Sequence, residues 1–326
     1  MNILKAWARL NYESIEPILT GLINQTYLVK TQTGSYILQK LHSVFAPEVN
    51  KNILAVTDYL ASQNFLTPRL IKTDSGELWV LEEDNSCWRL LSFIEGQSFD
   101  QLTSSEAAYS AGQLVGQFHK TLFDFKYDYA AVRKNVHDTP GYLKRLAENL
   151  KQHTKHAFFK RVEPIATQLI QQASQIPNLW NLPNRHSHGD LKISNLLFEG
   201  EKAICLIDLD TLGKMPWPIE MGDAFRSWCN LKGENQSQSN FDLNIYHAAL
   251  QGYQEQVWDC WSEPEREALL DGIRLIPLEL CARFLNDIFD DSYFSWDIKR
   301  FKSRAEHNWV RAMGQWSLYE DILRKL

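Results

Sequence analysis

The sequence has few cysteines, no long apolar run and no clustered positive charge. Its five cysteines are widely spaced and none forms a CxxC pair, so neither a zinc site nor a disulfide framework is predicted. No stretch approaches the ~20 apolar residues that a membrane span needs, and the N-terminal segment is too polar for a secretory signal. We therefore expect a cytosolic protein with reduced thiols and no membrane partner.

The charge balance argues against a nucleic-acid partner. The 326 residues include 40 acidic and 34 basic side chains, mixed along the chain, and the net charge is -6. Nucleic-acid-binding proteins neutralise phosphates with clustered Lys and Arg, and no such cluster is present. The length and an apolar content of 44% allow one large domain or two lobes with a sizeable core. A monomer and a homodimer are both compatible with this composition.

The first 95 residues have the sequence pattern of a β-sheet with one helix. Short segments rich in β-branched and aromatic residues alternate with turn signals, which predicts strands. A run with apolar residues at helical spacing behind a proline predicts the helix Pro47–Gln63. The predicted strands are Ser14–Ile18, Thr26–Thr31, Tyr36–Leu41, Arg69–Thr73, Leu78–Glu82 and Trp88–Phe93.

After Glu95-Gly96 the pattern becomes mainly helical. Two short apolar strands, Asn195–Phe198 and Ala203–Ile207, interrupt it. We therefore predict an α+β fold with a small antiparallel N-lobe at residues 1–95 and a large, mostly helical C-lobe at 96–326, which is the outline of a bilobal protein-kinase-like fold. Other α+β folds share this pattern, so the motifs decide between them. The predicted C-lobe helices are Ser104–Phe123, Tyr142–His153, Ala157–Gln175, Met221–Leu231, Asn240–Val257, Glu263–Phe284 and Arg304–Leu323.

One string carries most of the predicted chemistry. His188-Gly189-Asp190 is followed five residues later by Asn195, and Asp208 closes the next apolar strand. Phosphoryl transfer from ATP needs a carboxylate facing the acceptor hydroxyl and oxygen ligands that hold Mg²⁺ on the phosphates. Asp190 is predicted to orient the hydroxyl and accept its proton, and Asn195 and Asp208 to bind the metal. A lone HGD tripeptide is also typical of an ordinary turn, and His188 is expected to support the loop by hydrogen bonding.

With these strings the sequence resembles the aminoglycoside phosphotransferase and choline kinase superfamily, and most closely its N-acetylhexosamine 1-kinase branch, over nearly the whole chain. The resemblance implies ATP as donor, Mg²⁺ as cofactor and a small-molecule acceptor, first of all the anomeric hydroxyl of an N-acetylhexosamine. The matching segments are Gly21–Val29, Tyr36–Lys40, Asn52-Ile53, His137–Pro140, His188–Asn195, Ile207–Thr211, Gly222-Asp223 with Arg226, Glu279–Phe284, and Glu306–Asn308 with Arg311.

Two segments are predicted to bind the nucleotide. Gly21 allows close backbone approach to the phosphates, and Asn24 and Thr26 offer polar groups to them; an ordinary hairpin turn is the alternative. The adenine is expected at the hinge, where Phe93 and Glu95 provide extended backbone.

The third strand departs from the protein-kinase pattern. A lysine on that strand normally contacts the phosphates and pairs with a helix glutamate. Here Gln39 occupies the lysine position, Lys40 follows it, and Asn52 stands where the glutamate is expected. Only one of two successive strand residues faces the cleft. A neutral Gln39–Asn52 pair and a phosphate-binding Lys40 both remain open.

The acceptor is expected in the C-lobe. Glu279, Arg283 and Asp287 are spaced at i, i+4 and i+8 and so share a helix face, although a solvated ion-pair ladder has the same spacing. Asp210 and Arg226 are further candidates for acceptor contacts, and Asp223 is expected to cap a helix or brace the catalytic loop.

Two alternatives to a sugar kinase remain at this level. Another acceptor, such as choline, an aminoglycoside, homoserine or a protein hydroxyl, keeps the same chemistry. A non-catalytic nucleotide-binding module is favoured by the missing strand lysine. Retention of Asp190, Asn195 and Asp208 together argues against it.

Overall fold

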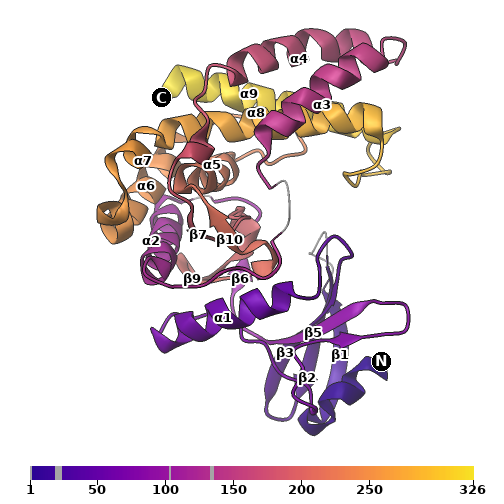
Figure 1. The fold of residues 1–326 in the computed structure, drawn as a ribbon, viewed down its shortest axis with the longest axis vertical. Coiled ribbons are helices and arrows are strands. Elements are labelled where there is room, and N and C mark those ends of the chain that lie inside the picture. Colours follow the sequence, from indigo (N-terminus) through magenta and orange to yellow (C-terminus); the bar gives the residue numbers. More distant parts are fainter. Residues whose placement is uncertain (1, 19–23, 103, 133–135) are drawn as a thin grey trace.

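The computed structural model describes residues 2–18, 24–102, 104–132 and 136–326. It has the predicted α+β architecture, with an antiparallel sheet in the N-terminal part, which we call the N-lobe, and mainly helices in the C-terminal part, the C-lobe (Figure 1). None of the described helices combines the length and the apolar character needed to cross a membrane.

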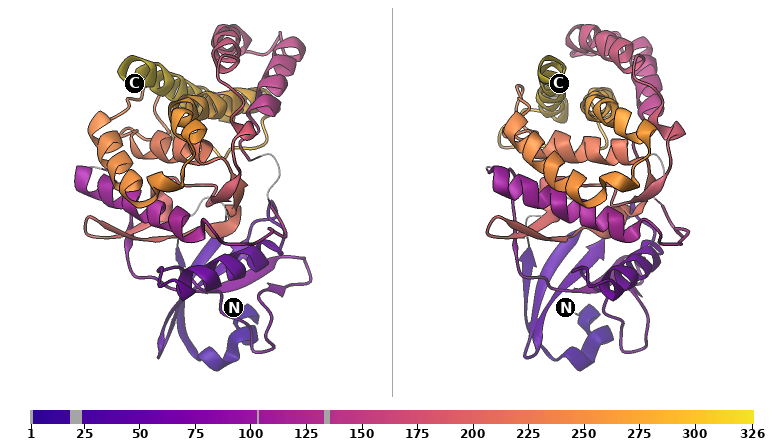
Figure 2. Two further views of the ribbon diagram at one scale, coloured as in Figure 1. Left: turned by 60° about the vertical axis from the view of Figure 1, so that its left-hand side comes forward. Right: turned by 90° about the vertical axis from the view of Figure 1, so that its left-hand side faces the viewer.

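The N-lobe is a five-stranded sheet in the order β1-β2-β3-β5-β4, with every neighbouring pair antiparallel. A 3₁₀-helical segment, Asn2–Leu10, packs on its outer face. Helix α1 lies on the inner face, between the sheet and the C-lobe (Figures 1 and 2). The elements are β1 (Tyr12–Ile18), β2 (Gln25–Thr31), β3 (Gly34–Leu41), α1 (Val49–Ser62), β4 (Val80–Leu81) and β5 (Cys87–Ser92).

One predicted strand is wrong and another is shorter than predicted. The segment predicted as strand 69–73 forms only an isolated bridge, between Leu70 and Leu91. The indole Nε1 of Trp7 donates to the Ile71 carbonyl at 2.8 Å, so this oxygen is taken by a side chain instead of a ladder. The predicted strand 78–82 is reduced to β4, whose two residues pair with Trp88 and Cys87.

Strand alternation divides the side chains of β3 and β5 between two environments. Leu38 faces Leu90 on the outer side, in the cluster that includes Trp7. Ile37 faces Leu91 on the inner side, against the core that α1 shares with the C-lobe. Residues 39 and 40 therefore lie on opposite faces of the sheet.

The C-lobe helices follow the predicted order with shifted boundaries. The helix predicted from Met221 begins at Trp217, because Pro218 is tolerated in the first turn. The single helix predicted for 263–284 is two helices that meet at Ala268, and the second continues to Asp290. The helices are α2 (Ser105–Leu122), α3 (Thr139–Gln152), α4 (Phe159–Ala173), α5 (Trp217–Trp228), α6 (Leu243–Val257), α7 (Glu263–Glu267), α8 (Leu269–Asp290) and α9 (Arg304–Lys325).

Helices α2 and α6 pack backbone against backbone at two glycines. A Cβ on Gly112 would lie 2.0 Å from the Ala249 carbonyl oxygen, and one on Gly252 would lie 2.1 Å from the Tyr109 carbonyl oxygen. These distances are well below van der Waals contact, so only glycine fits at either position.

We expect Gly252→Ala to destabilise the protein by about 1–3 kcal/mol, because the added methyl group must push the two helices apart. Thermal unfolding monitored by circular dichroism measures this change. The control is Gln251→Ala, an exposed position on the same helix, which should stay within about 0.5 kcal/mol of the unaltered protein. Equal melting temperatures for the two variants would contradict the close packing.

Two small sheets hold the predicted catalytic string in position. Strand β7 (Arg185–Ser187) pairs with β10 (Gly213–Met215), and β6 (Gln97–Ser98), β8 (Leu196–Glu199) and β9 (Lys202–Leu206) form the second sheet. The string 188–195 connects β7 to β8, and residues 207–212 connect β9 to β10. The pairing therefore brings these two connections side by side. Asn195 ends a 3₁₀ turn, Ile193–Asn195, and is not the first residue of a strand as predicted.

Candidate active site

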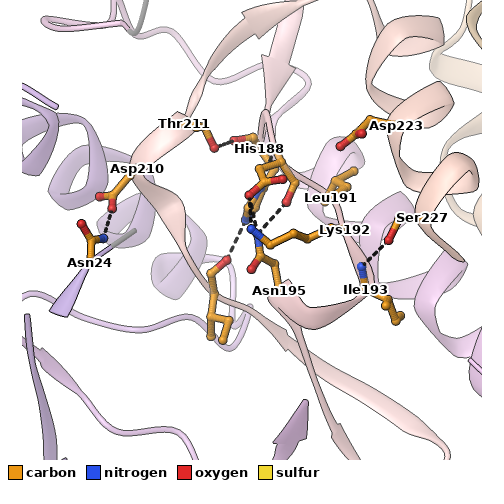
Figure 3. Close-up of polar contacts among 12 residues, drawn as sticks. Asn24, His188, Leu191, Lys192, Ile193, Asn195, Asp210, Thr211, Asp223 and Ser227 are labelled. Atoms are coloured by element: carbon orange, nitrogen blue, oxygen red, sulfur yellow. Dashed lines mark hydrogen bonds and ion pairs between the residues drawn. The ribbon is translucent and has the colours of Figure 1, made fainter. Parts of the chain in front are cut away.

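Asp190 lies at the centre of the catalytic loop with its carboxylate held by two side chains. Lys192 donates its Nζ to Oδ2 of Asp190 at 2.7 Å, and Asn195 donates its Nδ2 to the same oxygen at 2.9 Å (Figure 3). Burial raises the pKa of Asp190, but Lys192, His188 and Asn195 together outweigh burial and hold the pKa below its ordinary value. The carboxylate is therefore ionised near neutral pH and able to accept a proton.

The loop is braced from behind by buried groups. His188 donates Nε2–H to the Ile207 carbonyl at 2.9 Å and accepts the Asp190 amide at Nδ1 at 3.3 Å. The carboxylate of Glu220, on α5, accepts the backbone amides of His188 and Gly189 at 2.7 and 3.3 Å. Burial lowers the pKa of His188, so the ring is neutral and supports the loop through hydrogen bonds.

Asp208 occupies a crowded acidic position. Its backbone is left-handed, with φ 63° and ψ 58°, which is uncommon for a residue other than glycine. Burial, and then the neighbouring carboxylates of Asp210 and Asp190, raise the pKa of Asp208 to about 6. A carboxylate whose charge is opposed in this way is well suited to a bound cation, which would stabilise the ionised form.

The two predicted metal ligands fit a divalent cation. Among the described residues there is no cluster of three or more His, Cys, Asp or Glu side chains suited to metal binding, so the fit rests on Asp208 and Asn195. Mg²⁺ is commonly held by one or two protein oxygens and completed by phosphate oxygens and water. Asn195 uses its Nδ2 for Asp190, which leaves its amide oxygen for a metal.

Gln39 and Lys40 point to opposite sides of the N-lobe. Gln39 lies opposite Arg89 on the inner face and accepts two hydrogen bonds from its guanidinium, at 2.7 and 3.0 Å. Lys40 lies on the outer face, 5.7 Å from the ring centre of Trp88 and 3.7 Å from the Asp84 carboxylate. The cleft-facing residue of the pair is therefore Gln39.

The predicted Gln39–Asn52 pair does not form. Asn52 donates to the Ala131 carbonyl at 2.7 Å and accepts from the Tyr127 hydroxyl and the Ala130 amide, so it anchors the 127–131 segment. Asn50, two residues earlier, reaches Arg89 instead. The difference arises because α1 presents residue 50, and not residue 52, toward the Gln39 face of the sheet.

The other predicted nucleotide residues lie around the junction of the lobes. Asn24 bridges the His42 amide and the Asp210 carboxylate, and Thr26 accepts from Gln39 at 3.3 Å. Phe93 and Glu95 are exposed in the extended connection between β5 and β6. Gly21 lies outside the described residues.

Three of the predicted acceptor residues are engaged elsewhere. Both oxygens of Asp210 bind Arg89, and Asp210 is almost fully buried. Glu279 accepts from His137 at 3.0 Å and from Thr139 at 2.5 Å. Asp287 accepts the backbone amides of residues 292–294 and the Asn308 side chain. Each of the three carboxylates thus has buried partners within the protein, and a direct contact with the acceptor stays a prediction.

Arg226 and Asp223 form a buried pair at 2.9 Å, and Arg226 also binds Glu234 at 2.6 Å. These ion pairs give Arg226 a structural role, and its contact with the acceptor stays a prediction. Asp223 lies close enough to both Lys192 and Arg283 to stabilise their charged forms. It therefore stands between the catalytic loop and α8.

Two of the predicted acceptor residues, Arg283 and Asp287, line a cavity. This cavity of about 680 Å³ lies between the N-lobe segment 44–49 and the C-lobe helices α3 and α8. The Arg283 guanidinium lies 5.3–5.7 Å from the ring centres of Tyr142, Tyr293 and Phe294. Within the described part of the chain, no carboxylate is within 4 Å of it, whereas Arg145 in the same cavity is paired with Asp290.

Three residues with clear places in the site were not assigned from the sequence. Lys192 lies within the predicted string, two residues after Asp190, and its spacing was a usable signal. Glu220 and Arg89 gave no such signal, because their partners lie 32 and 121 residues away along the chain.

A small antiparallel lobe joined to a helical lobe is the arrangement of the protein-kinase-like fold. Residues 14–263 match the Phosphotransferase enzyme family, and the chain belongs to this family. It is thus an enzyme that transfers a phosphoryl group to a hydroxyl acceptor, with ATP as donor and a divalent cation as cofactor.

Known proteins similar to the chain agree with this class. A homoserine kinase of Zymomonas mobilis is 24% identical over 261 residues, which cover 79% of this chain and 76% of that protein. A GDP complex of an aminoglycoside 2′-phosphotransferase superimposes with a TM-score of 0.66 at 14% identity, over 99% of this chain and 97% of the other. A microcompartment-associated aminopropanol kinase gives a TM-score of 0.65 at 15% identity, over 99% and 96%. The two structures share the fold with this chain.

Proposed function

We propose that the enzyme transfers the γ-phosphoryl group of ATP to a hydroxyl of a small polar molecule, with Mg²⁺ as its metal. The observation that carries this proposal is the Asp190 carboxylate, ionised and fixed by Lys192 and Asn195 beside the crowded Asp208. Asp190 orients the acceptor hydroxyl and accepts its proton as the oxygen attacks the γ-phosphorus.

The remaining groups of the loop position and neutralise charge. Asn195 and Asp208 would hold the metal, which supplies charge neutralisation on the phosphates when bound. Lys192 lies next to Asp190 and is suited to stabilise the transferred phosphoryl group. Asn24 and Thr26, with Gly21, would cover the phosphates, and the backbone near Phe93 and Glu95 would receive the adenine.

The first candidate acceptor is a hydroxy amino acid of the homoserine class. The curated relatives that match about three quarters of the chain are named homoserine kinases. Of the other charged groups that line the cavity, Arg145 is paired with Asp290, and Asp287 accepts three backbone amides. The Arg283 guanidinium has no carboxylate within ion-pair distance among the described residues, so it offers a position for an anionic group. A carboxylate-bearing acceptor would supply that partner.

A sugar or amino sugar is the second candidate. The sequence resemblance to N-acetylhexosamine 1-kinases supports it, and the aromatic rings of Tyr142, Tyr293 and Phe294 offer surfaces for a sugar ring. In this case Arg283 would donate hydrogen bonds to neutral oxygens.

A screen of homoserine, N-acetylhexosamines, choline and an aminoglycoside, followed by acceptor-dependent ADP release, distinguishes these candidates. If the acceptor carries a carboxylate, we expect Arg283→Met to raise its KM by about 10- to 100-fold, the usual cost of losing a charged hydrogen bond. Arg145→Met is the matched control, since this arginine lines the same cavity but is paired with Asp290. A neutral sugar as the best substrate, with an unchanged KM in Arg283→Met, would reject the amino-acid proposal.

A further inference from the structure

A buried arginine joins the two lobes at the candidate active site. Arg89, on β5, and Asp210, in the 3₁₀ turn Leu209–Thr211, each have only 1% of the side chain exposed. Their side chains form a two-pronged ion pair, one prong of which measures 3.0 Å. The two residues are 121 positions apart and belong to different lobes.

All five N–H groups of Arg89 are accounted for. Two go to the Gln39 amide oxygen, at 3.0 and 2.7 Å, one goes to Asn50 at 3.3 Å, and two go to Asp210. A buried guanidinium requires this degree of satisfaction, because an unpaired charge in the interior is strongly destabilising. Arg89 therefore has no donor left over for a ligand in this arrangement.

The Asp210 carboxylate also binds a third segment of the chain. Asn24 donates its Nδ2 to Oδ2 of Asp210 at 2.6 Å (Figure 3). Its own Oδ1 accepts the His42 amide at 2.9 Å. The end of the segment proposed to cover the phosphates, strand β5 and the metal-binding connection thus meet at Asp210, two residues after Asp208.

We propose that Arg89 is a positioning residue for phosphoryl transfer, which acts through Asp210 to fix Asp208. The proposal rests on the proposed function. In protein kinases a strand lysine and a helix glutamate align the N-lobe with the phosphates. Here the strand residue is the neutral Gln39, and the positive charge comes from the opposite position on β5. Its acidic partner belongs to the C-lobe, so the pair ties the sheet directly to the metal-binding connection.

The geometry separates this role from direct phosphate binding. A phosphate contact would require Arg89 to give up Asp210, which would leave a buried carboxylate beside Asp208. A positioning role keeps every buried charge paired. It also neutralises Asp210, so that the site does not present an additional free negative charge to the nucleotide.

The experiment compares Arg89→Met, Asp210→Asn and the double variant with the unaltered enzyme. Each single change should lower kcat by about 100-fold, the usual effect of a small misplacement of catalytic groups, and leave the KM of the acceptor within about twofold. The double variant should be no slower than either single one, because the two side chains act as a unit. Arg89→Lys should recover only part of the kcat that Arg89→Met loses, since the lysine ammonium cannot form the two parallel hydrogen bonds of the guanidinium.

A second readout uses the protein without nucleotide or metal. The amides of Ile207 and Leu212 are bonded within or beside the connection, to Asn195 and Leu209. The hydrogen exchange of these two amides should be about tenfold faster in Asp210→Asn. Asparagine keeps the shape of the aspartate side chain, so this variant is chosen because it should still fold. Arg69→Met is the control, because Arg69 forms an exposed pair with Asp58 and should change neither readout.

Three results would overturn the proposal: unchanged kcat and exchange in Asp210→Asn, multiplicative losses in the double variant, or an effect of Arg89→Met on the KM of ATP alone. The last result would make Arg89 a phosphate ligand. If the unaltered protein transfers no phosphate to any acceptor, the proposed function fails. The exchange comparison would then still decide whether Arg89 fixes the connection.

Discussion

Asp190→Asn should reduce kcat by about 1,000-fold while leaving the affinity for ATP nearly unchanged. The asparagine keeps the shape of the side chain but cannot accept the proton of the attacking hydroxyl, and general-base groups contribute about 10²–10⁴-fold. Nucleotide affinity should survive, because the side chains proposed to contact ATP lie on other segments of the chain. Single-turnover kinetics measures the chemical step, and titration with an unreactive ATP analogue measures binding.

The matched control for Asp190 is Asp84→Asn, an exposed aspartate between β4 and β5. This variant should turn over like the unaltered enzyme. A kcat close to normal in Asp190→Asn would contradict the role of Asp190 as the general base. A large loss of ATP affinity would instead indicate that Asp190 takes part in nucleotide binding.

Asp208→Asn should be nearly inactive and yet more stable than the unaltered protein when metal is absent. Loss of a metal-binding carboxylate removes several kcal/mol of charge stabilisation, or about 10³-fold in rate. The stability gain has a separate cause. Burial and the nearby Asp210 and Asp190 carboxylates oppose the charge of Asp208, and the amide removes that repulsion.

The stability gain of Asp208→Asn should depend on pH in a defined direction. The folded protein holds the Asp208 proton more tightly than the unfolded chain does, because the folded pKa is raised to about 6. The unaltered protein therefore loses stability as the pH rises through this range. Thermal unfolding in EDTA should show Asp208→Asn more stable at pH 8, with the difference shrinking as the pH falls below about 6. Added Mg²⁺ with nucleotide should stabilise only the unaltered protein, and equal melting temperatures at pH 8 would contradict the assignment.

The arrangement of the predicted catalytic string depends on residues that are close together in sequence. Asp190 and Asn195 are five residues apart, and the bond between their side chains closes within one loop. Asp208 follows a strand that pairs with the strand after Asn195, so short-range pairing alone brings it close. The antiparallel N-lobe and the helical C-lobe likewise follow from residue periodicity, which depends on near neighbours in sequence.

The acceptor predictions rested on a shared helix face. Glu279, Arg283 and Asp287 do share one face of α8, but each meets a different neighbour. Glu279 accepts from Thr139, the first residue of α3. Asp287 holds the turn after α8, and Arg283 and Asp287 both line the cavity. Spacing along a helix shows which residues lie together, but the packing of other segments decides what they contact.

The amino-acid sequence was thus sufficient for the fold class and for the unusual glutamine on β3, and it supplied the catalytic trio as a prediction. Tertiary structure alone revealed how that glutamine is accommodated. Its partner Arg89 is 50 residues away on a neighbouring strand, and the Asp210 carboxylate that pairs with Arg89 is a further 121 residues along, in the other lobe. No local pattern specifies such contacts, because strand register and lobe packing bring these side chains together. Their burial then requires each charge to find a partner.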